Sequence, residues 1–186
     1  MTGIRKGRRD KLVKTAFTLF YQSGFHATGI DKILSTSGVA KMTLYNHFGS
    51  KDVLVKIALV EKSERVINWI NNTLMNTHLG PLLRLLAIFD LHEVWFQDLG
   101  FKGCVFNKAT AEYPEIDDPI HQVAMDHYLK ILNILRALCD EAGLRKSTII
   151  ADQIFILLQG AITTAFVTGA PIAARRAKRA AEQLFI

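Results

Sequence analysis

Two short helical segments joined by a glycine-containing link constrain the fold of this chain more than any other feature. The apolar pattern predicts one helix over about residues 29–35 and a second over about residues 40–47. Gly38 lies in the link and supplies the positive φ that a sharp turn between helices requires. A longer helix over about residues 8–23, ended by Gly24, precedes them. Together the three segments predict a helix-turn-helix unit.

Helical patterns continue through the rest of the chain. The β-branched residues are scattered and do not alternate with polar ones, so strands have little support. We therefore predict an all-α fold of about nine helices, with a helix-turn-helix domain over residues 1–50 and a helical bundle over residues 51–186. The later helices are expected over about residues 50–76, 81–98, 104–113, 120–142, 149–168 and 172–185.

Polar side chains at two helix starts predict caps. Thr28 is placed to cap the second helix, and Asp31 three residues later would complete a capping box. Ser50 is placed to cap the fourth helix. Asp52 then lies in the first turn of that helix, where the helix dipole favours an acid.

The net charge is +6, and the basic excess lies near the N-terminus. Residues 1–62 hold 11 Lys and Arg against four Asp and Glu, whereas residues 63–186 hold 12 against 13. This asymmetry indicates nucleic acid or an acidic membrane as a partner, although a basic face that only aids solubility explains the charge equally well. The basic run 5–9 fits either a solvated tail or a flexible arm with phosphate contacts. The run 175–179 is expected to be a solvated helix face.

Several other classes of protein find no support. No uncharged apolar stretch reaches 18 residues, and the N-terminus lacks the apolar region of a secretory signal. Cys104 and Cys139 are too few for a disulfide scaffold, which favours the cytoplasm. His121 and His127 are six residues apart and so do not share a helix face as a metal pair would. We expect no metal, no cofactor, no catalytic residue and no membrane association.

The helix over residues 40–47 has the two faces that a DNA-reading helix needs. Val39, Leu44 and Phe48 are spaced to point inward. A helix about eight residues long enters the major groove when its outer face is polar. The residues left to face outward are Lys41, Thr43, Tyr45, Asn46 and His47.

The segment from Thr28 to Leu54, with Gly-Val, Thr-Leu-Tyr, Phe and Lys at matching spacing, resembles the DNA-binding segment of TetR-family regulators. The resemblance covers about residues 8–60 closely, and the remainder matches in length and helix pattern only. It implies that Thr28 and Lys51 contact phosphates and that Thr43 and Tyr45 reach a base edge and a phosphate. The full set expected to contact DNA is Thr28, Lys41, Met42, Thr43, Tyr45, Asn46, His47 and Lys51.

Ala40 departs from the family, which often has Ser at this position. Alanine has no side-chain oxygen to cap the helix that follows it, which costs about 1 kcal/mol. The departure affects one phosphate contact and leaves the rest of the motif intact.

The resemblance also implies that residues 51–186 bind a small-molecule effector and form a homodimer. The apolar helix over residues 149–168 and the alanine-rich one after it are the expected seam, with intrachain core as the alternative. The seam residues are Phe155, Leu158, Ile162, Ala165, Ala173 and Ala177. An apolar pocket with a few polar groups is expected from Phe89, His92, Phe96, Phe106, Asn107, Met125 and Tyr128, although such residues are more often ordinary core.

These observations favour a dimeric regulator that binds a palindromic DNA operator, represses transcription as the family usually does, and is released by a small apolar or aromatic effector. Cys104, with Lys102 and Lys108 nearby in sequence, allows an alternative regulator that responds to oxidants or electrophiles. An inert buried cysteine competes with that alternative. An enzyme would need a close nucleophile–base pair, which no spacing suggests. A membrane-surface protein would need a basic amphipathic helix in place of these compact turns.

Overall fold

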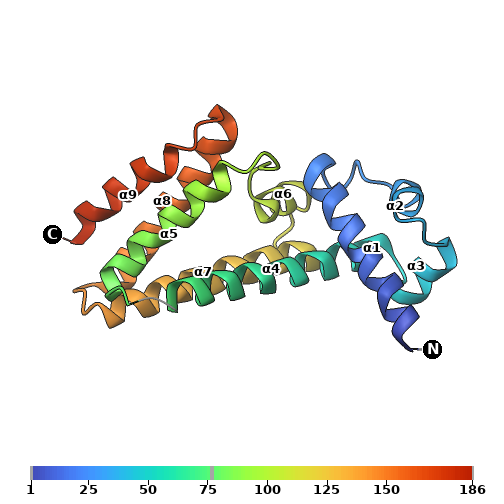
Figure 1. Cartoon of the computed structure of the whole chain (residues 1–186), viewed down its shortest axis with the longest axis horizontal. Coiled ribbons are helices and arrows are strands. Elements are labelled where there is room, and N and C mark those ends of the chain that lie inside the picture. Colours follow the sequence, from blue (N-terminus) through green and yellow to red (C-terminus); the bar gives the residue numbers. More distant parts are fainter. Residues whose placement is uncertain (1, 76–77, 186) are drawn as a thin grey trace. The chain divides into compact units, whose positions relative to one another are not determined.

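The computed structural model describes residues 2–75 and 78–185, with side chains from residue 7. Over those ranges it contains nine α-helices, a terminal 3₁₀ turn and no strand (Figure 1). The all-α prediction is therefore confirmed. The elements are α1 (Thr2–Ser23), α2 (Ile30–Ser37), α3 (Lys41–Phe48), α4 (Lys51–Met75), α5 (Pro81–Phe96), α6 (Val105–Glu112), α7 (Pro119–Glu141), α8 (Ser147–Thr168), α9 (Ala173–Glu182) and η1 (Gln183–Phe185).

The predicted boundaries hold within about two residues except at the start of α1. That helix begins at Thr2, six residues before the predicted start, so the backbone of the basic run 5–9 is helical rather than a flexible arm. Lys and Arg are good helix formers, and Gly7 alone does not stop the helix. The last predicted helix is divided, because its final three residues form η1.

The chain divides into two compact units whose membership does not follow sequence order. The head unit consists of the chain up to Glu64 together with Val105–Asp126. The body unit consists of Arg65–Cys104 and the chain from His127 onward. Helix α6 therefore packs with the helix-turn-helix, although it lies far from it in sequence.

The core of the head unit follows the predicted periodicity. Leu12, Ala16 and Phe20 of α1 are fully buried, and so are Ile33 of α2 and Leu44 of α3. Burying one such aliphatic or aromatic side chain contributes about 1.5–3 kcal/mol. Helices α1, α2 and α3 thus share one core.

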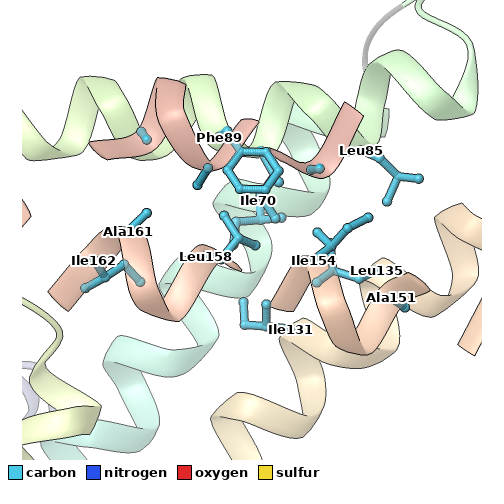
Figure 2. Packing of buried hydrophobic residues seen from close by; sticks show 14 of the residues in the cluster. Ile70, Leu85, Phe89, Ile131, Leu135, Ala151, Ile154, Leu158, Ala161 and Ile162 are labelled. Carbon is cyan, nitrogen blue, oxygen red and sulfur yellow. The ribbon is translucent and has the colours of Figure 1, made fainter. Parts of the chain in front are cut away.

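In the body unit, α9 packs against both α5 and α8. The largest buried side chains come from α4, α5, α7 and α8 and meet in one cluster (Figure 2). Alanines at the contact between α8 and α9 let the two backbones approach closely. The labelled members of the cluster are Ile70, Leu85, Phe89, Ile131, Leu135, Ala151, Ile154, Leu158, Ala161 and Ile162.

Five of the six residues predicted for the dimer seam are buried within this core, and the seam itself stays a prediction. Only Phe155 is partly accessible. Helix α8 is apolar on two faces, so its pattern could not tell which face turns inward. The five residues buried within the chain are Leu158, Ile162, Ala165, Ala173 and Ala177.

The opposite face of α8 is exposed and also apolar. Ile156 is 68% exposed, and Ile149, Phe166 and Val167 are exposed as well. Helix α8 is long and apolar enough to cross a membrane by length and composition, but the core helix of a soluble protein passes the same test. With one face in the core, α8 thus keeps a second apolar face that is largely exposed, although its Phe166 packs edge-on against Phe101.

Candidate nucleic-acid interface

Helix α3 presents a polar outer face over an apolar inner one, as predicted. Leu44 and Phe48 are buried in the head unit. Met42 is 70% exposed and Tyr45 40% exposed. Among the other predicted contact residues, Lys41 and Asn46 are exposed, and Thr43, His47 and Lys51 are partly exposed. All seven share the outer side of this short segment.

The link between α2 and α3 is held by a buried serine that the sequence did not single out. Gly38 adopts φ +64°, and its N–H donates to the Leu34 carbonyl oxygen at 2.8 Å. The Ser37 hydroxyl donates to the same oxygen at 3.3 Å and accepts a hydrogen bond from Val39 N at 3.3 Å. Ser37 therefore fixes the direction in which α3 leaves the turn. The signal for it was a serine directly before a C-capping glycine.

The predicted capping box at α2 is wrong. Gly29 is the N-cap residue, and no side chain caps the helix. Thr28 is only 2% exposed, and its hydroxyl donates to the Gly24 carbonyl oxygen at 2.7 Å. A threonine hydroxyl readily bonds a backbone carbonyl in a nearby turn, and here that acceptor is four residues back. Thr28 thus closes the corner between α1 and α2, with its hydroxyl proton engaged inside the unit.

The starts of α3 and α4 agree with prediction. Ala40 is the N-cap of α3, and no side chain caps that helix. At α4, Val53 N donates to Ser50 Oγ at 3.2 Å, and Asp52 lies in the first turn. Lys51 opens α4, where helix N-termini favour anions such as phosphate.

Arg9 connects three helices of the head unit. Its guanidinium carbon lies 5.9 Å from the centre of the Phe48 ring on α3. Its Nη1 pairs with Glu61 of α4 at 3.0 Å. Arg9 thus holds the C-terminal end of α3, which accounts for one member of the basic run 5–9.

The corner between α1 and α2 is also held from α6, which lies beside the end of α1 in Figure 1. The Glu112 carboxylate accepts hydrogen bonds from Phe25 N at 2.9 Å and His26 N at 2.6 Å, and it lies 3.0 Å from His26 Nδ1. Lys108 Nζ donates to the Tyr21 carbonyl oxygen at 2.9 Å. We call Lys108 and Glu112 the α6 clamp.

The electrostatics of Glu112 follow from these contacts. Burial alone raises the pKa of its carboxyl, but the two backbone N–H donors and the His26 ring outweigh burial and place the pKa below its ordinary value. The carboxylate is thus held charged against the corner.

The residues predicted to bind an effector fall in both units. Phe89, His92, Phe96 and Tyr128 belong to the body unit, and Phe106, Asn107 and Met125 belong to the head unit. Phe89 and Phe106 are almost fully buried.

Within the body unit, His92 lies in an aromatic cluster. Its ring centre is 5.9 Å from that of Trp95 and 6.0 Å from that of Phe96. The centre of the Phe101 ring lies 5.1 Å from that of Phe96. Burial lowers the pKa of His92, and the hydrogen bond of its Nδ1 with the Ile88 carbonyl oxygen at 2.7 Å opposes this only in part. The lowered pKa favours the neutral imidazole, and because Nδ1 faces a carbonyl oxygen it must carry the proton, which leaves Nε2 as an acceptor.

The two cysteines differ in environment. Cys139 is buried, and burial followed by the nearby Asp140 charge raises the pKa of its thiol to about 11. Cys104 is partly exposed and shares a hydrogen bond with the Tyr128 side chain. Burial, with Cys104 as a further cause, raises the pKa of Tyr128. Lys108, whose proximity to Cys104 stays a prediction, donates a hydrogen bond to the Tyr21 carbonyl oxygen in the head unit.

The basic run of α9 is paired rather than purely solvated. Arg175 Nε lies 2.7 Å from Glu93 of α5, and Lys178 Nζ lies 2.7 Å from Asp90 of the same helix.

On α8, the exposed face carries a shallow hollow. It is lined by Phe155, Ile156, Gln159, Gly160, Thr163 and Thr164.

Among relatives of known sequence, the transcriptional activator FasR of Mycolicibacterium smegmatis is 34% identical over 73 residues, 39% of this chain and 33% of that protein. The repressor KstR2 of the same species is 31% identical over 85 residues, 44% of this chain and 40% of that protein. The chain thus spans well under two thirds of both relatives.

Among solved structures, SCO4454 of Streptomyces coelicolor, a TetR-family transcriptional regulator, superposes with a TM-score of 0.89 at 25% identity, over 96% of this chain and 94% of that one. The reduced form of Escherichia coli NemR also superposes with a TM-score of 0.89, over 97% of each chain, and at 19% identity it supports the fold alone.

Two family models match the chain. The model of bacterial regulatory proteins of the tetR family matches residues 12–57, which contain the helix-turn-helix. The model of the tetracyclin repressor-like C-terminal domain matches residues 81–181, more than half of the chain. With its helix-turn-helix and its all-helical fold, this chain belongs to the TetR family of transcriptional regulators.

Proposed function

We propose that two copies of this chain bind a palindromic operator and repress transcription until a small apolar or aromatic effector releases them. The observation that carries the proposal is the outer face of α3, which gathers hydrogen-bonding side chains over a buried apolar face. The family assigns DNA binding to this motif. For this chain, we propose the operator, the effector, the dimer and the direction of regulation. We also propose that the protein is cytoplasmic and that its DNA-binding and effector-binding parts divide at residue 50.

For DNA, the proposed roles are a base-edge contact for Thr43 and phosphate contacts for Tyr45 and Lys51. Lys41, Met42, Asn46 and His47 surround them on the same outer side. Thr28 is left with a positioning role, because its hydroxyl is engaged at the corner. Selection of bound fragments from a random DNA pool tests the proposal. We expect two dyad-related half-sites about one helical turn apart, and an unsymmetrical or random outcome contradicts it.

The direction of regulation is open to a direct test. One named relative is an activator and another a repressor. A reporter gene placed behind the selected operator should be transcribed less when this protein is present. More transcription would make it an activator.

For the dimer, we propose that the exposed face of α8 is covered by the same face of a second copy. Its hollow includes Gly160, where a close helix approach meets no side chain. Ile156→Glu should convert the dimer into a monomer in sedimentation, because it places a charge in the seam. Val94→Glu is the matched control, since Val94 is also 68% exposed but lies on α5. Equal behaviour of the two variants contradicts the assignment.

For the effector, we propose binding at the aromatic cluster around His92 in the body unit. A neutral imidazole among aromatic rings suits an apolar molecule that donates one hydrogen bond. A screen of aromatic compounds can follow Trp95 fluorescence in a Trp69→Phe variant, because the centre of the Trp95 ring lies 5.0 Å from that of Phe101 and 5.9 Å from that of His92. Hits should weaken operator binding in a gel shift. Compounds that quench Trp95 and leave DNA affinity unchanged count against an inducer site there.

A second candidate is regulation through Cys104, favoured by its partial exposure and its hydrogen bond with Tyr128. The Cys104 thiol would lose its proton to water, and the thiolate would then add to one carbon of the C=C bond of an electrophile such as N-ethylmaleimide. The π bond opens as the sulfur–carbon bond forms, and the resulting enolate takes a proton from water. We expect release of operator DNA by the wild type and no release by Cys104→Ser. Equal release from both proteins removes this candidate.

A further inference from the structure

The corner between α1 and α2 carries backbone groups that neither helix satisfies. Phe25 and His26 lie after the end of α1 and before α2 begins, so their N–H groups have no place in either helical ladder. The Tyr21 carbonyl lies in the last turn of α1, where acceptors are left over and the helix dipole is negative. Such groups need partners from outside the two helices.

Helix α6 supplies these partners with two side chains of opposite charge. Lys108 and Glu112 are four residues apart and so lie on one side of α6. The lysine meets the Tyr21 carbonyl oxygen, and the carboxylate meets both N–H groups. Each charge thus lies against the backbone groups of complementary polarity.

Gly24 makes room for the carboxylate. It adopts φ +90°, and a Cβ added there would lie 2.7 Å from Glu112 Oε1. The Tyr113 ring follows directly and covers the same corner, stacking on His26 at 4.8 Å and meeting Phe25 edge-on at 6.0 Å. The corner is therefore shaped around Glu112, and any side chain at position 24 would displace it.

The segment that carries the clamp is joined at both ends to the body unit. The chain enters the head unit at Val105 and leaves it after Asp126. A change in the body unit that pulls on this segment would act on the corner through these hydrogen bonds. The corner in turn sets where α2 begins, and Ser37 sets the direction of α3 from α2.

We propose that Glu112, supported by Lys108, is a positioning residue for DNA recognition: it holds the α1–α2 corner in the arrangement that presents α3 to the operator. This inference rests on the proposed function and adds a point of control to it. Loss of the clamp should weaken specific binding, which needs a fixed α3, more than non-specific binding, which depends on charge alone.

The experiment compares Glu112→Gln with Glu115→Gln in the full chain. The first keeps the shape but removes the charge and one of two acceptor oxygens, and the second removes an exposed charge three residues later. Amide exchange of Phe25 and His26, followed by NMR, should become about tenfold faster in Glu112→Gln alone. Affinity for the selected operator should fall about tenfold, and affinity for random DNA should change less than about twofold.

Three outcomes overturn the proposal: unchanged exchange at the corner, faster exchange with unchanged operator affinity, or equal loss on operator and random DNA. Should Glu112→Gln fail to fold, Lys108→Met gives the second test, because it leaves in place the two Glu112 oxygens that accept from Phe25 N and His26 N. It should lower operator affinity by a smaller factor, and no change in affinity contradicts the proposal. If the wild type itself does not discriminate DNA, the proposed function fails, whereas the exchange data still test the clamp.

Discussion

At the scale of single residues, the N-terminus of α3 lacks a side-chain cap, because its N-cap residue is Ala40. A hydroxyl oxygen at this position could supply the missing hydrogen bond. Ala40 has an extended backbone, φ −66° and ψ 144°, as an N-cap residue should, but no oxygen to bond the free N–H groups. Ala40→Ser should therefore raise the free energy of unfolding by about 1 kcal/mol. Urea unfolding measures it. Ala180→Ser, at an exposed position inside α9, is the control and should not stabilise the protein.

Glu112 makes stability depend on pH in a defined direction. Its pKa in the folded protein lies below the ordinary value of 4.5, so the unfolded chain binds its proton first as pH falls. The carboxylate therefore stabilises the fold above pH 4.5, and this contribution is lost as pH falls through the lower, folded pKa. Urea unfolding between about pH 5 and pH 3 should show a shallower pH dependence in Glu112→Gln than in the wild type. Parallel curves would contradict the assignment.

Lys51 and Thr43 should separate affinity from specificity. Lys51→Ala removes a proposed phosphate contact, so it should weaken binding to all sequences alike and reduce the salt slope by about one unit. Thr43→Ala should change which operator is preferred, because its hydroxyl is proposed to face a base edge. Titrations on operator and random DNA at several salt concentrations distinguish the two, and identical effects would remove both roles.

At the scale of elements, the turn before α3 depends on Gly38. A left-handed φ such as +64° costs a residue with a Cβ about 1–2 kcal/mol of conformational free energy. Gly38→Ala should therefore lower the free energy of unfolding by about that amount. Gly7→Ala is the matched control, because Gly7 lies inside α1 with nothing near its Cβ position. That change should be neutral or stabilising. Equal destabilisation would show that the turn is not the cause.

How far the sequence predicts an element depends on contrast between its faces. In α3, polar and apolar residues alternate at helical spacing, so Leu44 and Phe48 could be assigned to the interior. In α8 both faces are apolar, so the pattern alone does not tell that Leu158 is buried within the chain and that Ile156 is exposed. At Thr28 the choice between two nearby hydrogen-bond partners depends on the exact backbone path, which periodicity does not describe.

At the scale of the whole molecule, a dimer through the exposed apolar face of α8, as proposed above, would link stability to protein concentration. If a second copy covers that face, unfolding also requires dissociation, so the thermal midpoint should rise as the protein is concentrated. Calorimetry over a hundredfold range of concentration measures this. Ile156→Glu should have a midpoint independent of concentration, and the same independence in the wild type would argue for a monomer.

The long-range pairing of α6 with the helix-turn-helix had no counterpart in the sequence. Glu112 lies 87 residues from Phe25 in the chain. No pattern of period or spacing reports such a contact. The predicted boundary at residue 50 accordingly follows the chain, whereas the compact units do not.

That pairing has a consequence for how the protein is made. The ribosome adds Glu112 some seconds after it has joined the first 64 residues, since chains grow at about 5–20 residues per second. Until then the N–H groups of Phe25 and His26 lack the carboxylate that they meet in the finished protein. The DNA-binding part of a nascent chain therefore gains the hydrogen bonds to Glu112 only some seconds after its own residues have been synthesised. A transcript truncated before α6 would yield a helix-turn-helix that lacks these hydrogen bonds at the α1–α2 corner.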